Sequence, residues 1–350
     1  RYEDLSYRGP IREKGIPNVF NVFDLDNTKK KARQDEWQEQ TQSVFASVEV
    51  GWKSMLYLTL TGRNDWASQL ANSSTPCFFY PSVGLSGVIS EMLTLPEFID
   101  YMKVRGSFSS VGMPYPRNLT SPTYEYDEAN QQWKPKTHYP IKDLKPERTN
   151  SWELGLDMRI FKDFSLGFSW YLANTFNQTF DPKVSVSSGY SKIYLQTGYV
   201  RNSGVELSLG YGHTWNNHLH WESNFTLSHN KNTIKDLVTS YIHPETGLPI
   251  TQNRLDVGGL GKARFILKKG GTLGDLYTQS DLKRDNSGMV EIDPSGALTT
   301  EDNLPDIKLG SVFPKANLAW NNRFEWRGIS LSALFTARIG GIAYSATQAA

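Results

Sequence analysis

Three histidines, His213, His218 and His220, fall close together in the sequence. Imidazole nitrogens are common zinc ligands, so such a cluster raises the question of a metal site. A structural zinc site uses four ligands, and no cysteine or close acidic partner completes such a set here. We therefore interpret the histidines as part of a polar turn and predict no bound metal.

Sequence motifs for catalysis are weak. A serine nucleophile elbow requires the spacing Gly-x-Ser-x-Gly, which the segment Gly84-Leu-Ser-Gly87 does not have. The segment Asp285-Asn-Ser-Gly288 resembles a calcium loop only loosely, because it lacks the alternating acidic ligands and the terminal glutamate. The sequence therefore predicts no catalytic residue and no cofactor, and we do not expect an enzyme. A hydrolase embedded in a barrel stays as a weaker alternative.

The candidate binding residues are aromatic and lie in the polar stretch 113–149. We single out Tyr124, Tyr126, Trp133 and His138 as candidate substrate contacts. Aromatic rings with a polar edge suit stacking on sugars, and they suit peptides equally well. The alternative is that this stretch packs on itself or against a partner lipoprotein, and the sequence leaves both open.

The segments that must position these loops read as long β-strands. Between Trp152 and Ile160 every second residue is apolar, and the alternation resumes from Leu166 to Leu172 after a turn at Lys162-Asp163. Side chains on a strand alternate between its two faces, so each strand has one apolar and one polar face. Strands of about 9–11 residues are long enough to cross a bilayer at a tilt.

The same pattern predicts an all-β chain after residue 41. We expect strands at 42–51, 55–65, 79–90, 99–112, 150–161, 164–177, 198–211, 219–231, 254–267, 272–282, 315–325 and 329–344. Short turns are expected at 52–54, 91–98, 162–163, 212–218, 268–271 and 326–328, alternating with long polar connections at 66–78, 113–149, 178–197, 232–253 and 283–314. In an antiparallel meander this places short turns at one end and long loops at the other, as in outer-membrane barrels.

Aromatic residues flank four of the predicted short turns. The pairs are Trp52 and Tyr57, Phe161 and Phe164, Trp215 and Trp221, and Phe324 and Trp326. They favour an aromatic girdle at a membrane interface, and ordinary cross-strand packing in hairpins is the alternative.

Charges of both signs are expected on the polar face, which would line a hydrated lumen. They are Lys103, Arg105, Glu153, Asp157, Arg159, Glu206, Glu222 and Arg338. A dry core would tolerate them only in pairs, and for most of them we expect salt bridges between neighbouring strands.

Composition excludes several classes of protein. The net charge is +1, so no nucleic-acid partner is expected, and no apolar run approaches the 18 residues of a transmembrane helix. Cys77 is the sole cysteine, which rules out a disulfide within the chain. Residues 1–41 read as a polar loop or strand remnant that could include one helical turn near 34–42.

Six stretches then occur in an order that resembles one family. They are LTGRNDW (60–66), FFYPSVGLSGVISEM (78–92), YMKVRGSFSSVG (101–112), LKPERTNSWELGLD (144–157), NSGVELSLGY (202–211) and ISLSALFTARIGG (329–341). Together they resemble the later barrel portion of the SusC/RagA-type TonB-dependent transporters of the outer membrane of Bacteroidota.

The resemblance implies a transmembrane antiparallel up-and-down β-barrel, of which residues 42–350 form a part. Barrels of this type have about 22 strands, so we expect a fragment that lacks the plug and the TonB-contacting segment. It also implies TonB-dependent uptake of oligosaccharides or oligopeptides at the outer membrane of a Gram-negative bacterium, together with a SusD-like surface lipoprotein. An adhesin or structural barrel that binds through its loops without transport is the alternative.

Overall fold

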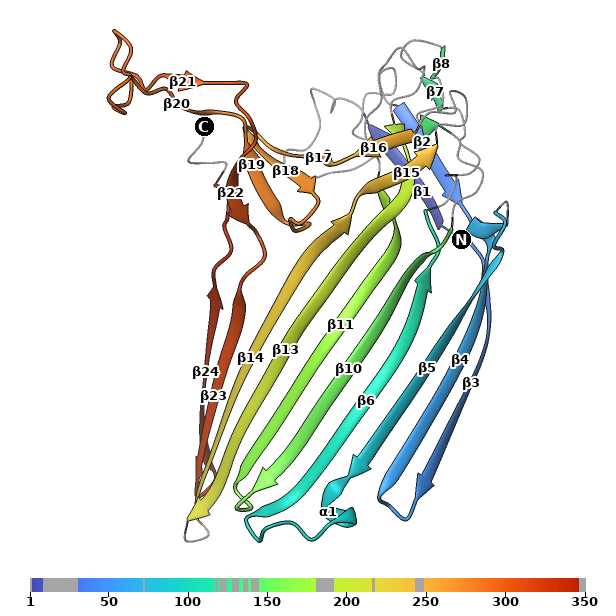
Figure 1. Ribbon diagram of the computed structural model, residues 1–350, viewed down its shortest axis with the longest axis vertical. Helices are drawn as coiled ribbons and strands as arrows, with labels where there is room; N and C mark the ends of the chain where they lie inside the picture. Colours follow the sequence, from blue (N-terminus) through green and yellow to red (C-terminus); the bar gives the residue numbers. More distant parts are fainter. Residues whose placement is uncertain are drawn as a thin grey trace, which may run out of the picture.

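One antiparallel sheet of ten strands dominates the computed structural model (Figure 1). The structure describes residues 2–8, 31–71, 73–116, 119, 125–127, 132–134, 138–139, 145–180, 192–215, 218–242 and 249–345. The strands of this sheet are β3 (Thr41–Trp52), β4 (Leu56–Ala67), β5 (Cys77–Val88), β6 (Ile99–Met113), β10 (Glu147–Ile160), β11 (Phe164–Phe180), β13 (Leu195–Trp215), β14 (Leu219–Asp236), β23 (Ala316–Trp326) and β24 (Ile329–Ile339). Their order in the sheet follows their order in the chain, so the predicted up-and-down topology is confirmed.

The connections differ in length between the two ends of the sheet (Figure 1). At the short-turn end, 53–55, 161–163, 216–218 and 327–328 have two or three residues each, and 89–98 is the exception with ten. At the long-loop end the connections are 68–76, 114–146, 181–194 and 237–315, each of nine residues or more. The 89–98 connection includes the single-turn helix α1 (Ile89–Met92). Phe161-Lys162 and Arg327-Gly328 each have two consecutive residues with positive φ. That geometry matches the twist of the flanking strands and closes tight hairpins.

Two of the twelve predicted strands are wrong as wall strands. The segment 254–267 is a hairpin of β17 (Arg254–Leu260) and β18 (Ala263–Lys268), and 272–282 contains β19 (Asp275–Thr278). With β22 (Ile307–Ser311) they form a separate sheet in the order β17-β18-β19-β22. Gly258 and Gly261 adopt positive φ of 106° and 57°, which ends the extended run early. The predicted short turn at 268–271 therefore lies at the long-loop end.

An apolar cluster lies where this four-stranded sheet meets the wall. Val200 and Ile234 of the wall pack with Leu237, Leu255 and Leu267, all at most 5% exposed. Backbone hydrogen bonds also connect the two sheets at this point. Ile234 N donates to Gly271 O and Gly270 N donates to Ile234 O, each at 2.8 Å. The four-stranded sheet is thus fixed to the long-loop end of β13 and β14.

A further correction concerns the first 41 residues. The helical turn expected near 34–42 is wrong, because β2 (Lys31–Trp37) pairs antiparallel with β1 (Tyr2–Arg8) and β3 begins at Thr41. The short segment between them has no helical residues.

One face of the wall leaves large apolar side chains uncovered. On β24, Ile329 and Leu331 are each 69% exposed and Phe335 is 60% exposed, and Trp152 and Leu154 on β10 are more than half exposed. A contiguous apolar face of this extent indicates contact with lipid or another protein, since no described part of the chain covers it. Within the described ranges, no helix has the length and apolarity needed to span a membrane.

Candidate functional site

The structure brings together two of the four predicted binding residues. Tyr126 in β7 (Glu125–Asp127) and Trp133 in β8 (Gln132–Lys134) are Cα partners in one small hairpin. His138 lies in β9 (His138–Tyr139), which pairs in parallel with β12 (Lys192–Ile193) and so joins the 113–149 and 178–197 connections. Tyr124 lies outside the described residues. Their contact with substrate stays a prediction.

The strand register places all eight predicted charges on one face of the wall. A single row across seven strands shows how the face is built: Arg105, Gly155, Ser169, Glu206, Ser228, Asn317 and Arg338 are successive partners from β6 to β24. Lys103, Glu153, Asp157, Arg159 and Glu222 have the same parity as this row. The prediction of one charged face is confirmed, and Ser228 and Asn317 are members that the sequence argument did not single out.

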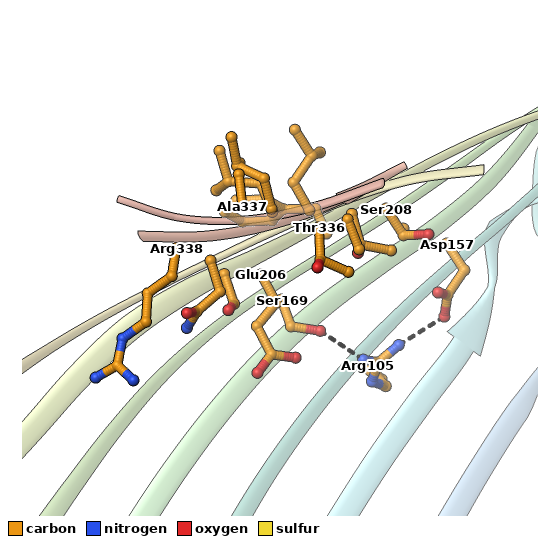
Figure 2. A pocket seen from close by; sticks show the side chains of 17 residues that line it. Arg105, Asp157, Ser169, Glu206, Ser208, Thr336, Ala337 and Arg338 are labelled. Atoms are coloured by element: carbon orange, nitrogen blue, oxygen red, sulfur yellow. Dashed lines mark hydrogen bonds and ion pairs between the residues drawn. The ribbon is translucent and has the colours of Figure 1, made fainter. Parts of the chain in front are cut away.

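Arg105 is the most connected side chain of this face (Figure 2). Its Nη1 donates to Asp157 Oδ2 at 2.7 Å, and its Nη2 donates to Ser169 Oγ at 2.7 Å and to Glu153 Oε1 at 3.3 Å. The guanidinium crosses β10 directly over Gly155, where an added Cβ would stand 2.5 Å from Arg105 Cζ. Glycine at this position therefore lets one cation reach two carboxylates on the same strand.

An open hollow of about 660 Å³ adjoins this network and extends to β24. Arg105, Ser169, Glu206 and Arg338 project from one side of the sheet, whereas Ala337 projects from the other (Figure 2). No histidine is among the residues that line the hollow, and Ser169 accepts a hydrogen bond from a cation instead of donating to a base. The arrangement can bind and orient polar groups, but it offers no activated nucleophile.

Gly204 lies on the same face of the wall, opposite Tyr171. In the structure the space above it is filled by the phenol of Tyr171 on the adjacent strand and by the carbonyl of His229. Gly210 likewise lies against Ser165 and Asn224. Both glycines therefore leave room for neighbouring groups within the wall.

The histidines at the short-turn end have structural partners. His213 Nδ1 lies 2.8 Å from Asp163 Oδ2, and His220 Nδ1 lies 2.9 Å from Thr214 Oγ1. The sequence argument missed Asp163 because 50 positions separate it from His213, and the turn between β10 and β11 brings the two together. Among the residues that the structure describes, no three His, Cys, Asp or Glu side chains gather where a metal ion could bind.

Aromatic side chains form a continuous row at the same end of the wall. Ring centroids are 4.8 Å apart between Phe164 and Tyr211, 5.2 Å between Tyr211 and Trp221, and 5.7 Å between Trp221 and Phe324. The row crosses β11, β13, β14 and β23, so it extends beyond any one hairpin. Such a band is what a membrane interface requires.

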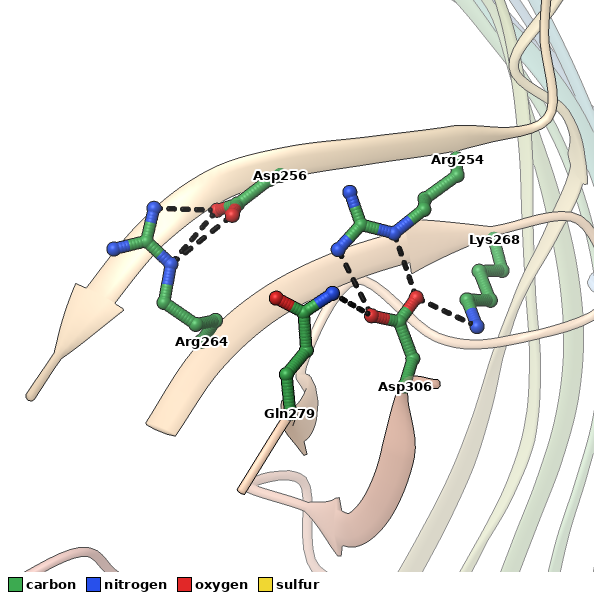
Figure 3. Close-up of polar contacts among 6 residues, drawn as sticks. All are labelled: Arg254, Asp256, Arg264, Lys268, Gln279 and Asp306. Carbon is green, nitrogen blue, oxygen red and sulfur yellow. Dashed lines mark hydrogen bonds and ion pairs between the residues drawn. The ribbon is translucent and has the colours of Figure 1, made fainter. Parts of the chain in front are cut away.

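Ion pairs hold the four-stranded sheet at the opposite end (Figure 3). Arg254 donates to both oxygens of Asp306, at 2.6 and 2.9 Å, and Lys268 Nζ lies 2.9 Å from the same carboxylate. The hydrogen bonds from Arg254, with the charge of Lys268, hold the pKa of Asp306 far below its ordinary value. A second pair joins Arg264 to Asp256 at 2.9 Å.

Asp275 is the one fully buried carboxylate of this sheet in the described chain, with its side chain 1% exposed. Burial works to raise its pKa, but hydrogen bonds from Lys308 Nζ at 2.6 Å and from the hydroxyl and backbone N–H of Thr272 outweigh burial. The net pKa of Asp275 lies below its ordinary value.

Residues 279–304 form an arm that extends away from this sheet (Figure 1). Beyond the short pair β20 (Asp281–Leu282) and β21 (Thr300–Glu301), three backbone hydrogen bonds close a ring. Lys283 N donates to Thr299 O, Thr299 N to Glu291 O, and Glu291 N to Lys283 O, at 2.9–3.0 Å. The arm is therefore ordered by hydrogen bonds, and its apolar side chains Met289, Ile292 and Leu298 remain at least 60% exposed.

Comparisons with known proteins agree with this architecture. Residues 1–287 match the family model described as TonB dependent receptor-like, beta-barrel. TonB-dependent receptor P26 of Formosa agariphila is 23% identical over 350 residues, which cover 93% of this chain and 34% of that protein. TonB-dependent receptor P39 of the same organism is 23% identical over 271 residues, covering 74% and 23% respectively. The chain thus spans about a third or less of the length of these curated relatives.

Solved structures show the same fold. The RagAB peptide transporter superposes with a TM-score of 0.69 at 18% identity, over 91% of this chain and 35% of that one. The RagAB peptide importer in its closed-closed state gives 0.68 at 17% identity, over 93% and 35%. With the family match and the two-faced sheet, the chain belongs to the TonB dependent receptor-like β-barrel family of outer-membrane proteins.

Proposed function

We propose that the chain forms part of the wall of a TonB-dependent nutrient importer. The observation that supports this proposal most directly is the sheet itself, which has one charged face and one uncovered apolar face. A charged, hydrated face suits the passage of polar solutes, and the opposite face suits lipid. The edge strands β3 and β24 pair with further strands in this proposal, so that residues 42–350 become one portion of a closed barrel of about 22 strands around a plug.

The proposed cargo is an oligosaccharide or an oligopeptide. The RagAB structures are named as a peptide transporter and importer, which supports the peptide class. The network of Arg105 with Glu153 and Asp157 offers both donors and acceptors, and either class of cargo presents matching groups.

The proposed partner is a SusD-like lipoprotein seated at the long-loop end. Support comes from the concentration of structure there: the four-stranded sheet, its apolar junction with β13 and β14, and the small hairpin of Tyr126 and Trp133. In this proposal Tyr124, Tyr126, Trp133 and His138 contact the cargo from that end.

The experiment is uptake by cells that carry the full-length gene, a deletion of it, or a deletion of TonB. Labelled oligopeptides and oligosaccharides are supplied separately, and internalised label is measured. The proposal predicts that one of the two cargo classes enters the cells only when both the full-length gene and TonB are present. If label binds the surface equally with and without TonB and never enters, the protein is an adhesin or structural barrel and the proposal is wrong.

A further inference from the structure

The apolar face of the wall has one gap in an otherwise filled row of side chains. Across the row, successive partners are Leu58, Leu85, Gly106, Leu154, Trp170 and Val205. Gly106 is the one member of this row without a side chain. Along its own strand it lies between Val104 and Phe108, which share its face. Leu154 leans over one side of the gap, since a Cβ added at Gly106 would stand 3.3 Å from Leu154 Cδ2, and large apolar residues border the space that remains.

The gap opens into a groove of about 450 Å³. Its walls are Val83, Leu85, Phe108, Trp152, Leu154 and Trp170. Phe108 and Trp152 are in contact, with ring centroids 4.7 Å apart, so they form a firm end wall. Leu85 and Leu154 on its two sides are 53% and 57% exposed, so the groove opens outward.

The chemistry of the groove selects a hydrocarbon. The backbone of its floor is already paired, since Gly106 lies within the ladders of β6 with β5 and with β10. A peptide would find no free strand edge there, and the side chains of the apolar face offer a sugar almost nothing to hydrogen-bond. Apolar walls around a narrow gap instead gain dispersion and burial from a flexible chain of methylene groups.

The position of Gly106 identifies the leaflet. The short-turn interface is marked by Phe98 and Phe161, next to Ile99 at the start of β6. Gly106 lies seven residues further along the strand, a distance of roughly 23 Å. With a strand tilt of about 40° that is roughly 17 Å of height, in the upper part of an apolar band about 25 Å tall. The long-loop side of the band is the surface-exposed leaflet.

From this geometry we infer that the groove at Gly106 binds one acyl chain of a lipid of the surface-exposed leaflet. The chain lies between Leu85 and Leu154 and ends against the Phe108–Trp152 pair. The inference rests on the membrane setting of the wall and is independent of the cargo or of transport.

The test is native mass spectrometry of the full-length protein extracted from outer membranes in mild detergent. The wild type is expected to retain a lipid that survives extraction, and its mass identifies the headgroup and hence the leaflet. Gly106→Leu fills the gap, and retention should fall about tenfold, the factor that corresponds to loss of contact with about two methylene groups. Ala333→Leu adds one carbon fewer than Gly106→Leu, at an exposed position of the same face, and should retain lipid as the wild type does.

Folding of each variant is checked by the shift in gel mobility between heated and unheated samples. If Gly106→Leu does not fold, Leu154→Ala removes one wall without adding bulk and should also lower retention. Equal retention in Gly106→Leu and Ala333→Leu overturns the inference. So does a retained lipid of the other leaflet, or a wild-type dimer that Gly106→Leu separates, because a second copy would then occupy the groove.

Discussion

At the scale of single residues, the charged face depends on where side chains are absent as well as where they are present. Arg105 reaches Asp157 and Glu153 because Gly155 leaves its path clear. Glu153 and Asp157 are the diagonal neighbours of Arg105, within reach of a long side chain, and a side chain at the direct partner position would stand between them. The glycine therefore determines the charge pattern that any solute in the barrel interior would encounter.

A substitution at Gly155 should therefore be costly. Gly155→Val is expected to displace the Arg105 guanidinium and to lower the free energy of unfolding by about 1–3 kcal/mol, as overpacking does. The measurement is urea unfolding in lipid vesicles, followed by tryptophan fluorescence. Gly84→Val is the matched control, because a Cβ there meets only Thr59, at 3.9 Å. Equal losses in the two variants would contradict the role of Gly155.

The alternation of side chains was enough to predict that these charges lie on one face. It could not predict which of them contact one another across neighbouring strands. Arg105 and Ser169 meet through the register of two hairpins, and Asp163 meets His213 across 50 positions. Register depends on turn geometry, and Phe161-Lys162 forms a positive-φ turn without the glycine or asparagine that would reveal it in the sequence.

At the scale of elements, the four-stranded sheet is a folded unit built into one connection. Its strands β17 and β18 are short, and β17 contains two glycines. Ile266 and Leu267 of β18 are both buried although they are adjacent. A strand buried on both faces loses the simple alternation on which the strand prediction relied. The sequence therefore predicted extended segments there correctly, but it could not show that they lie outside the wall.

The pH dependence of this sheet follows from Asp275 and Asp306. Both have folded-state pKa values below the ordinary value near 3.8, so both contribute stability above that value. That contribution is expected to be complete above about pH 5 and to disappear as the pH falls through the lowered values. Hydrogen exchange of β18, β19 and β22, corrected for the intrinsic rate at each pH, measures it.

The control for this pH effect is Asp275→Asn, which removes the titrating group. Its pH dependence should be weaker than that of the wild type over the same range. Identical profiles for the wild type and Asp275→Asn would show that Asp275 does not supply the effect.

The arm at 279–304 should be dispensable for folding. Its ring of hydrogen bonds lies within the arm, and no arm residue belongs to the apolar cluster at the junction with β13 and β14. Replacement of residues 281–301 by a short Gly-Ser linker is therefore expected to change the free energy of unfolding by less than about 0.5 kcal/mol, the usual range for surface changes. A larger loss, seen in the same vesicle unfolding assay, would show that the arm braces the wall.

At the scale of the whole molecule, two faces of one sheet define the protein. Period-two alternation and sorted connection lengths were sufficient to predict the antiparallel wall, because both properties act along the chain and need no distant contact. The four-stranded sheet depends on contacts between segments far apart, such as Arg254 with Asp306, which no local pattern reports.

The most direct test of this account compares the two faces of one strand in living cells. In a full-length background in which every cysteine, Cys77 included, is replaced by serine, Leu154→Cys and Glu153→Cys place single thiols on opposite faces of β10. Each variant is exposed to a lipid-dissolved maleimide and to a small water-soluble maleimide. The account predicts that Leu154→Cys reacts mainly from the lipid and Glu153→Cys mainly from water. If Leu154→Cys reacted as readily with the water-soluble reagent as Glu153→Cys does, the apolar face would not lie against the membrane, and the account would be wrong.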